Sequence, residues 1–475
     1  MSTSAVARTR LPLRPVPWSS VSDSTTPDTA ADHLYDAVII GGGPSGSSCA
    51  YWLARAGWDV AVVEKKTFPR AKTCGDGLTP RSVRQIADMG LEEQVAAAGH
   101  RYGGLRACGF GQEMAMQWPD HPSFPSYGYC ITRFDLDGLV ATNAAAAGAT
   151  VFNGIEAIEL LDVSEPIAEH RLAGASGVLV KDKATGTTTA LRGRIVVIAD
   201  GANSRMGRLL GTQRRRDWPM GMALRGYYTS PLHDDDFIES HLDIRDAQGN
   251  IVPGYGWIFP LGDGRVNVGV GLLSTDRRWK GVNTTKLMET FVDFAPDRWE
   301  LTNESAVGPA TGGRLPMGFS VGPRTGATTI AIGDASGAIN PFNGEGIAYG
   351  YETGRLAAAS IAESLGGGGE EALATYEERL TQAYGTYYDV ARAFVRLISE
   401  PKLMAMCVGV GMRSETLMNE LLALMANLLR PDERGPAEVA YRAMATLGRL
   451  LPDKALAALF NDTKQASLTS VSSAA

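Results

Sequence analysis

The chain has 475 residues, 44% of them hydrophobic, which is enough to bury the cores of two joined domains. Its 45 basic residues are outnumbered by 52 acidic ones, so the net charge is −7 and no nucleic-acid partner is expected. The five cysteines are odd in number and show no Cys-x-x-Cys spacing, which argues against a disulfide framework and against any metal site of the zinc type. A reducing, cytoplasmic compartment follows.

The first 33 residues are rich in Ser, Thr, Pro and Ala and show neither helical nor strand periodicity, which predicts a disordered tail. Three arginines at positions 8, 10 and 14 also suit an organelle transit peptide, but three prolines interrupt the amphipathic helix that such peptides use. No apolar run of 18 residues occurs, so the sequence predicts no membrane-spanning helix.

The first strong pattern runs from Tyr35 to Gly46, where an apolar strand meets a Gly-rich turn that opens a helix. Gly41 permits the tight turn, Gly43 lets the backbone approach a pyrophosphate, and Gly46 lets helix and strand pack closely. Glu64 ends the next apolar strand, where its carboxylate can accept both ribose hydroxyls and would repel a 2′-phosphate. These features predict a dinucleotide site that disfavours NADP; an ordinary Gly-rich turn is the alternative.

A structured loop is expected from residue 65 to residue 79, which is too broken by Pro and Gly for a strand and too polar for a core. Within it Cys74, Gly75, Asp76 and Gly77 follow one another. Two glycines around an acid suit backbone that is held tightly against a flat ligand. A surface loop with an incidental thiol is the alternative.

Two later strands end in acids, at the sheet edge where ligands of open α/β sheets collect. One apolar run ends at Asp200, and another ends at Asp334, shortly before a helix that begins near Gly344 and Gly346. A carboxylate beside open helix N–H groups can bind the ribityl chain and the ring carbonyl of a cofactor. Arg133 stands just before a further predicted helix.

From residue 218 to residue 318, short runs of β-forming residues alternate with turn dipeptides, which predicts a mainly antiparallel domain. The predicted fold class is therefore α/β, with a Rossmann-like domain and an interleaved β domain. The predicted organisation is a tail (1–33), a dinucleotide-binding domain in two parts (34–217 and 319–400), a substrate domain (218–318), a helical C-terminal region (401–462) and a second tail (463–475).

Three motifs in this order resemble the FAD-dependent oxidoreductases built like aromatic hydroxylases: the glycine turn, Asp200-Gly-Ala-Asn-Ser204 and Gly333-Asp334. Within that group, the run Pro253-Gly-Tyr-Gly-Trp-Ile-Phe-Pro260, followed by Gly269-Val-Gly271, resembles the geranylgeranyl reductases. The Cys-Gly pair at Cys74 resembles them as well. The resemblance covers roughly residues 35–400 and implies FAD as the cofactor.

Two further stretches are most like the actinobacterial menaquinone reductases, which saturate a double bond of the prenyl side chain. They are the string from Cys74 to Arg81 and the phrase from Pro122 to Tyr127. By this resemblance Cys74 would face the flavin, Tyr255, Trp257 and Phe259 would line the substrate cavity, and Cys74, Tyr255 and Trp257 would be the catalytic residues. The implied FAD-binding residues are Gly41, Gly43, Ser45, Gly46, Glu64, Gly75, Asp76, Gly77, Arg133, Asp200, Asp334, Gly344 and Gly346.

The implied reaction suits these residue types. An isolated trisubstituted alkene is not electrophilic, so reduced flavin can deliver hydride only if a proton reaches the other carbon, and positive charge then develops on carbon. Aromatic faces stabilise such charge by roughly 0.5–2 kcal/mol per well-placed ring, and each buried CH₂ of the chain adds about 0.8 kcal/mol. No proton donor stands out; water held near Cys74 or Tyr255 suits that role as well as either side chain.

Three alternatives stay open. The same family could act on prenyl lipids or geranylgeranyl diphosphate. An aromatic hydroxylase, monooxygenase or halogenase shares the framework, although Gly207 stands where hydroxylases tend to have Arg. A non-catalytic prenyl-lipid-binding flavoprotein would need a decayed loop, whereas Cys74 to Gly77 is intact. No second nucleotide fingerprint occurs, so the expected electron donor is transiently bound NAD(P)H or a small redox protein.

The region beyond Pro401 has apolar, methionine-rich segments that are too short to span a bilayer. Flexible Met side chains suit irregular core packing or contact with a variable lipid tail. Core packing is the favoured reading. A water-insoluble substrate must nevertheless be collected from a membrane, so peripheral contact with the inner face of the cell membrane is a further expectation.

Overall fold

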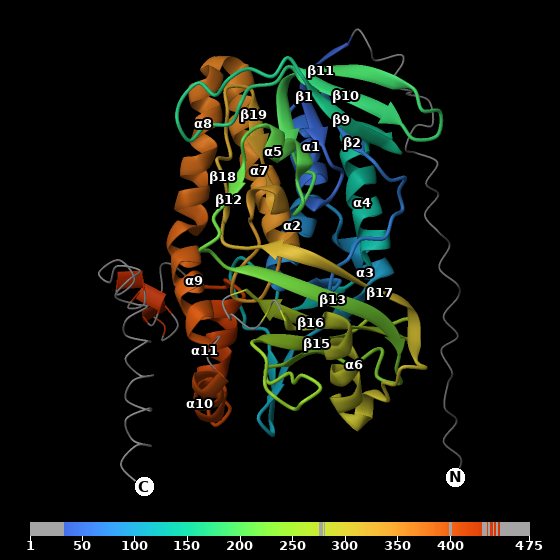
Figure 1. Ribbon diagram of the computed structural model, residues 1–475, viewed down its shortest axis with the longest axis vertical. Helices are drawn as coiled ribbons and strands as arrows, with labels where there is room; N and C mark the ends of the chain where they lie inside the picture. The colour runs from blue at the N-terminus through green and yellow to red at the C-terminus, as the bar shows by residue number, and fades with distance from the viewer. Residues whose placement is uncertain are drawn as a thin grey trace.

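The computed structural model describes residues 33–274, 279, 281–398, 401–429, 435, 438–439, 441–442 and 445–446. Two β-sheets lie one below the other in Figure 1, and a column of helices runs along one side of both. The two predicted tails, apart from residue 33, lie outside the described residues, as do the arginines considered for a transit peptide and most of residues 430–462.

The first sheet forms around β1 (Leu34–Ile40), the apolar strand before the glycine turn. β1 pairs in parallel with β2 (Val60–Glu64) and β11 (Thr188–Ile198). β8 (Thr150–Asn153) and β19 (Thr329–Ala331) continue the parallel order on either side. The glycine turn and the predicted acids all follow the carboxyl ends of these strands, so the chain order brings them to one edge of the sheet.

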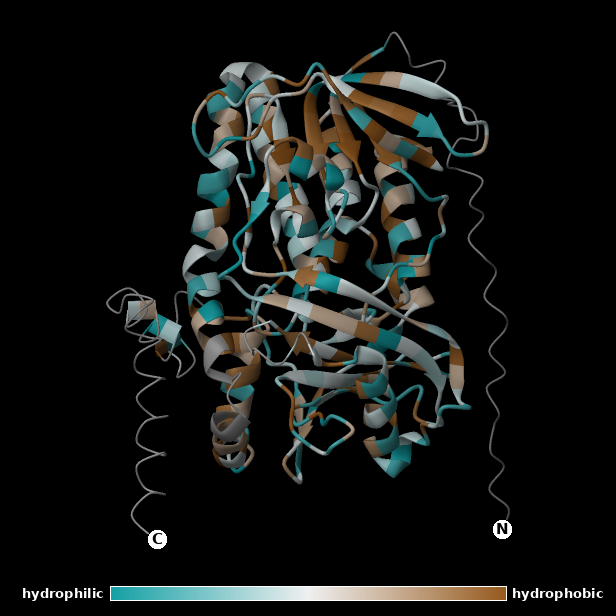
Figure 2. Cartoon of the chain, in the orientation of Figure 1, coloured by the Kyte–Doolittle hydropathy of each residue, from teal (hydrophilic) through white to brown (hydrophobic). Residues whose placement is uncertain are grey.

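The central strands are buried on both faces because their alternating side chains meet two different layers. Ala37 and Ile39 pack among the helices, whereas Val38 and Ile40 pack in a separate core with residues of β10. β9 (Ile155–Leu161) and β10 (Gly177–Asp182) form an antiparallel meander with the first half of β11. Figure 2 shows these central strands mostly in the colour of hydrophobic residues.

Helices cover one face of the first sheet, and two of them, α8 and α9, form the upper part of the column in Figure 1. α1 begins at the glycine turn and packs closely against α7. A Cβ at Gly354 of α7 would lie 2.4 Å from the carbonyl oxygen of Ser45, so the small residue sets this close approach. The bounds are α1 (Pro44–Arg55), α2 (Pro80–Asp88), α3 (Glu92–Ala98), α4 (Arg133–Ala146), α7 (Ile347–Glu363), α8 (Gly369–Leu380) and α9 (Thr386–Ile398).

The second sheet is antiparallel except for one parallel pair, β14 with β5, which confirms the predicted mainly antiparallel character. Its β5–β6 hairpin comes from residues 104–117, which the sequence placed in the first domain, so the sheet extends beyond the predicted range 218–318. Its strands, in order, are β17 (Ala306–Pro316), β13 (Met220–Thr229), β16 (Arg265–Leu273), β15 (Gly254–Pro260), β14 (Phe237–His241), β5 (Gly104–Gly109) and β6 (Gln112–Gln117).

The two faces of the second sheet have different partners. Val266, Val268 and Val270 of β16 belong to a core with α6 (Thr284–Phe294). The alternate residues of β16, beginning with Asn267, lie on the opposite face, which meets the loop around Cys74. Strand alternation therefore separates the structural core from the face that meets the first domain.

The C-terminal helices α10 (Pro401–Gly411) and α11 (Glu415–Met425) pack near the lower end of the helical column. α11 packs against β6, and Met412 and Met418 are buried in a core with Trp118. No helix among the described residues is long and apolar enough to cross a membrane. Smaller elements are β3 (Gly77–Leu78), β4 (His100–Tyr102), β7 (Gly128–Cys130), α5 (Arg205–Leu209), η4 (Asp297–Trp299), β12 (Gln213–Arg214), β18 (Val321–Gly322) and η5 (Gly333–Ser336).

Candidate active site

The glycine turn has the geometry of a cradle. Gly41 has φ +110°, and a Cβ there would lie 2.3 Å from the carbonyl oxygen of Ala199. A Cβ at Gly46 would lie 1.9 Å from the carbonyl oxygen of Gly41, so helix and strand meet backbone to backbone. At Gly43 the nearest atom to a Cβ is a guanidinium nitrogen of Arg70 at 3.8 Å, so the space above this residue is open. The turn thus leaves room for a ligand at the start of α1.

Glu64 is buried at the end of β2 and already has protein partners. Its carboxylate accepts hydrogen bonds from the N–H groups of Gly42 (3.1 Å) and Lys66 (3.0 Å) and from Arg70 (3.2 Å). Because a carboxylate has about four lone-pair directions, room remains for one ligand hydroxyl rather than two. Arg70 also pairs with the buried Asp137 at 2.9 Å, and sequence reasoning missed both of these residues.

Two predicted acids lie on the cavity wall. Asp200 accepts the N–H groups of Arg205 (2.8 Å) and Met206 (3.1 Å) with one oxygen, while its other oxygen is buried and has no hydrogen-bond partner among the described residues. Burial raises the pKa of Asp334, against the opposing charges of Lys72 and Arg133. Both acids suit hydroxyl donors of a bound ligand.

The loop around Cys74 is held by side chains of the second sheet. The carbonyl oxygen of Cys74 accepts hydrogen bonds from Arg225 (3.1 Å) and Asn267 (2.9 Å). The carboxylate of Asp76, which is fully buried, accepts from Tyr227 (2.7 Å), Asn267 (2.8 Å) and the N–H of Arg133 (3.2 Å). Asp76 therefore ties the loop to β13, β16 and α4, while it also lies on the cavity wall, and its predicted place beside the cofactor stays a prediction.

Cys74 and Arg133 both lie on the cavity wall. Burial raises the pKa of the Cys74 thiol, with Arg133 acting in the opposite direction, so the thiol stays neutral near pH 7. The guanidinium of Arg133 is engaged by Asp137, with contacts of 2.5 and 2.7 Å. The side chain of Arg133 forms a buried ion-pair group with Asp137 and Arg70, and its predicted contact with FAD stays a prediction.

The three predicted aromatic residues project from one face of β15 because they alternate along it. The ring centroids of Tyr255 and Trp257 are 5.7 Å apart, and those of Trp257 and Phe259 are 6.2 Å apart. The indole N–H of Trp257 donates to the side-chain oxygen of Asn267 at 2.9 Å. A Cβ at Gly269 would lie 2.2 Å from the indole, so the neighbouring strand leaves a slot for this ring.

One cavity of about 770 Å³ connects these parts. It runs from the glycine turn past the Cys74 loop and the aromatic residues to the inner side of α11. Every predicted site residue lines it except Gly46, which lies beneath the turn. The far part is apolar. It is lined by residues of the methionine-rich segments noted in the sequence, Met404, Met418, Leu421 and Met425, and by residues that the sequence did not single out, Leu105, Met116, Trp118 and Ile238.

These residues fit an FAD molecule. The open space at Gly43 suits a pyrophosphate, and Glu64 keeps one direction for a ribose hydroxyl. The unpartnered oxygen of Asp200 and the carboxyl group of Asp334 lie on the same cavity wall, where the remainder of an extended dinucleotide would run. The loop held by Asn267 then borders the space left for a flat ring.

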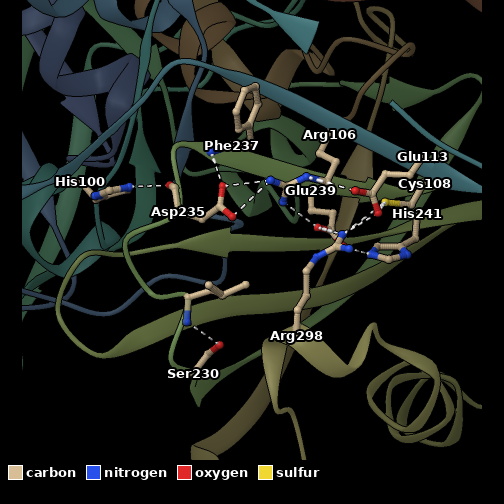
Figure 3. A network of polar contacts seen from close by, with 11 residues as sticks. His100, Arg106, Cys108, Glu113, Ser230, Asp235, Phe237, Glu239, His241 and Arg298 are labelled. Atoms are coloured by element: carbon tan, nitrogen blue, oxygen red, sulfur yellow. Dashed lines mark hydrogen bonds and ion pairs between the residues drawn. The ribbon is translucent and has the colours of Figure 1, made fainter. Parts of the chain in front are cut away.

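A second polar cluster lies on the second sheet, outside the cavity lining (Figure 3). Ligand atoms of Cys108, Glu239 and His241 lie within 4.8 Å of one another, the spacing of a metal site. The Glu239 carboxylate, however, already contacts Arg106 (3.1 Å), Arg298 (2.7 Å) and His241 (2.8 Å). Burial raises the pKa of Glu239, but the hydrogen bonds from His241 and Arg298 outweigh it and lower the pKa to about 2. Two guanidinium groups on one carboxylate disfavour an added cation, so the cluster acts as an ion-pair network.

Comparison with known proteins connects this geometry to a family. Residues 34–226 match the FAD binding domain family. The chain is 39% identical over 425 residues to the menaquinone reductase of Mycobacterium tuberculosis, covering 89% of this chain and 98% of that protein. It is 27% identical over 334 residues to digeranylgeranylglycerophospholipid reductase 2 of Methanosphaera stadtmanae, covering 70% and 78%.

Solved structures share the fold at lower sequence identity. A geranylgeranyl bacteriochlorophyll reductase-like protein from Thermoplasma acidophilum superimposes with a TM-score of 0.66 at 20% identity, over 86% of this chain and 96% of that one. A flavin-dependent brominase superimposes with a TM-score of 0.65 at 20% identity, over 88% and 99%. Likeness at this level shows the fold alone.

These findings confirm the predicted fold class and the predicted cofactor, FAD. They also confirm the resemblance that the motifs around Cys74 and Trp257 indicated. With 39% identity across 98% of a curated relative, the chain belongs to the menaquinone reductase family of FAD-dependent oxidoreductases.

Proposed function

We propose that the protein saturates an isolated C=C bond in the prenyl side chain of menaquinone. The observation that carries this proposal is the apolar cavity, which extends from the flavin site past Tyr255, Trp257 and Phe259 to the methionines of α11. A flexible hydrocarbon chain suits such a lining, since each buried CH₂ contributes about 0.8 kcal/mol. Support also comes from the relatives that are named menaquinone reductases.

Each part of the site has a role in this reaction. FAD, when bound and reduced, supplies a hydride. The glycine turn and Glu64 hold the nucleotide half, and the loop held by Asn267 fixes the distance between the cofactor ring and β15. The aromatic faces stabilise positive charge on the alkene without reacting with it. The apolar lining excludes water, so the developing charge is not captured by a hydroxyl group.

Product mass tests the proposal. Purified protein, incubated without oxygen with dithionite and menaquinone, should yield a quinone heavier by two hydrogens with an unaltered naphthoquinone ring. Digeranylgeranyl glycerophospholipid and geranylgeranyl diphosphate form the comparison panel, because other relatives are named for these substrates. Products that form only in the presence of oxygen, and that carry an added oxygen atom, would show that the protein is a hydroxylase.

We also propose that α10 and α11 contact a membrane surface. Met406 and Val410 are each 59% exposed, and Leu417 is 48% exposed. The same two helices contribute Met404 and Met418 to the cavity wall. One pair of helices thus carries both exposed apolar side chains and the far end of the cavity, which suits the transfer of a lipid tail from a bilayer.

Flotation with liposomes tests the membrane contact. Removing everything beyond residue 400 is unsuitable because α11 lines the cavity. The double variant Met406→Asp/Val410→Asp should float less than the wild type with vesicles of phosphatidylethanolamine and phosphatidylglycerol. Leu209→Asp, which alters a residue that is 54% exposed on α5, is the matched control and should float normally. Equal flotation of all three proteins would assign these residues to ordinary surface.

The electron donor remains a prediction: NAD(P)H or a small redox protein. Anaerobic mixing of the oxidised protein with NADH, with NADPH, or with a reduced ferredoxin should bleach the flavin absorbance in only one of the three cases. If the nicotinamide binds only transiently, the rate of flavin bleaching should rise with nicotinamide concentration, and no tightly bound complex should form.

A further inference from the structure

Glu345 lies on the cavity wall at the start of α7, between the two glycines predicted to bind FAD. One carboxylate oxygen accepts hydrogen bonds from the hydroxyl groups of Thr79 (2.6 Å) and Ser82 (2.9 Å). The other oxygen is buried and has no hydrogen-bond partner among the described residues. A carboxylate with one oxygen unpaired in an apolar site is costly, whereas a protonated carboxyl group is not.

The surroundings of Glu345 favour its neutral form. Burial raises the pKa of this carboxyl group, more than the hydrogen bonds from Thr79 and Ser82 and the charge of Arg81 lower it. Arg81 itself is paired with Glu352 at 2.8 Å, so its charge is already balanced. Glu352 also acts on Glu345 in the direction that raises the pKa. Glu345 therefore keeps a proton at a pH where an exposed glutamate has lost it.

The two side chains considered as proton sources from the sequence, Tyr255 and Cys74, are weaker acids than a carboxyl group. Burial raises the pKa of the Tyr255 hydroxyl, and this group donates its hydrogen to the carbonyl oxygen of Asn343 at 2.7 Å. Burial likewise raises the pKa of the Cys74 thiol. In water a carboxyl group is more acidic than a thiol by about 4 pKa units and than a phenol by about 6. A simple alkene is a poor base, so the strongest acid that is still protonated is the best donor.

We infer that Glu345 is the proton donor of the reductase, an assignment that rests on the function proposed above. The alkene π pair forms a C–H bond with the carboxyl proton, and the O–H bond of Glu345 breaks to leave a carboxylate. The adjoining carbon takes two electrons and a hydrogen as hydride from reduced FAD, which is reloaded by a two-electron donor. The product gains two hydrogens, and Glu345 regains its proton from water.

The pH dependence of turnover is assigned by comparison with Glu345→Gln, since other titratable groups surround Glu345 and line the cavity. The groups that interact with Glu345 are Arg81 and Glu352, and the tyrosines Tyr102, Tyr255, Tyr349 and Tyr387. Burial raises the pKa of each of these tyrosines, so they stay neutral at moderate pH. Turnover should therefore fall as the pH rises through the pKa of Glu345.

The test compares the wild type with Glu345→Gln, and uses Glu377→Gln as a matched control. Glu377 is a partly buried glutamate of α8 that pairs with Arg324 outside the cavity. Glu345→Gln should keep FAD and its absorbance spectrum but lose at least about 100-fold in turnover, the lower end of general acid catalysis. Its residual rate should be independent of pH where the wild type declines. Glu377→Gln should keep the wild-type rate and profile.

Two further measurements do not depend on the activity of Glu345→Gln. Infrared spectra of the wild-type protein at pH 7 should contain a protonated carboxyl band that is missing from Glu345→Gln, with and without FAD. Ser82→Ala removes a donor that stabilises the carboxylate, so it should raise the pKa of Glu345 and move the decline in turnover to higher pH.

Separate outcomes distinguish the two proposals. If the wild type forms no hydrogenated quinone, the proposed function fails. If the wild type forms it and Glu345→Gln does so at the same rate with the same pH profile, or if the carboxyl band is absent, the assignment of Glu345 is wrong. If turnover no longer declines with rising pH in Cys74→Ala but still does so in Glu345→Gln, the proton donor is the Cys74 thiol.

Discussion

Asn267→Ala should disrupt the contact between the two halves of the active site. The amide of Asn267 accepts the indole N–H of Trp257 and donates to the carbonyl oxygen of Cys74 and to the carboxylate of Asp76. All three contacts lie within 2.9 Å, and Asn267 itself is fully buried. Alanine removes them together without adding bulk.

The cost of this substitution can be worked out from the groups left behind. The carbonyl of Cys74 keeps its bond to Arg225, so it contributes little. The indole N–H is left buried without a partner, at about 1–3 kcal/mol, and the carboxylate of Asp76 loses a bond of about 1.5–3 kcal/mol. The free energy of unfolding should therefore fall by roughly 2.5–6 kcal/mol. For domains of 150–250 residues this lowers the thermal midpoint by at least about 5 °C.

Thermal unfolding of the FAD-loaded protein, followed by circular dichroism and by flavin fluorescence, measures the change. Asn250→Ala is the control, since Asn250 bonds Asp246 in an exposed turn and should shift stability by no more than about 0.5 kcal/mol. Asn267→Asp should also destabilise, because it places a second carboxyl group beside Asp76. If Asn267→Ala has the same thermal midpoint as Asn250→Ala, the hydrogen bonds of Asn267 do not hold the loop and the reasoning is refuted.

Three other perturbations give separate readouts. Gly43→Val should fold but bind no FAD, because a side chain there enters open cavity space. Gly46→Val should fail to fold, because its Cβ has no room. Flavin absorbance measures the bound FAD, and circular dichroism measures the folding. Trp257→Ala should keep FAD and lose turnover by roughly 2- to 30-fold from lost charge stabilisation alone, measured as product mass per unit time. The pKa of Glu239 is about 2 in the folded protein, against an ordinary value of 4.5. Its contribution to the free energy of unfolding is therefore complete above pH 4.5 and is lost as the pH falls toward 2. Glu239→Gln should flatten that part of a plot of urea midpoint against pH.

The sequence allowed the nucleotide-binding edge to be predicted because local chemistry determines it. A glycine turn between a strand and a helix has few conformations, so Gly41 and Gly46 could be given their roles before the structure was known. The alternation of Tyr255, Trp257 and Phe259 likewise places them on one face of a strand. Such features depend on neighbours in the chain, which a sequence displays directly.

The remaining site residues depend on contacts between distant segments. Asn267 lies 193 residues from its partner Cys74, and its one visible signal was a polar side chain between two buried valines. Arg70 resembled any loop arginine until β2 and α4 brought Glu64 and Asp137 to it. The β5–β6 hairpin gave no indication that it would join the second sheet, because its partner strand β14 follows more than a hundred residues later.

The cavity is stiff beside the aromatic residues and soft at the end that lies farthest from the glycine turn. In the stiff part, the slot at Gly269 and the bond to Asn267 hold the indole of Trp257. At the soft end, the walls include methionines of α10 and α11, whose unbranched side chains change shape at little cost. If the proposed function holds, lipid tails of different length or saturation would fit the soft end while the reacting carbon atoms stay beside Trp257. Substitutions in α10 and α11 would then change which lipids bind, and substitutions beside Trp257 would change the rate of the reaction. The two properties could change independently.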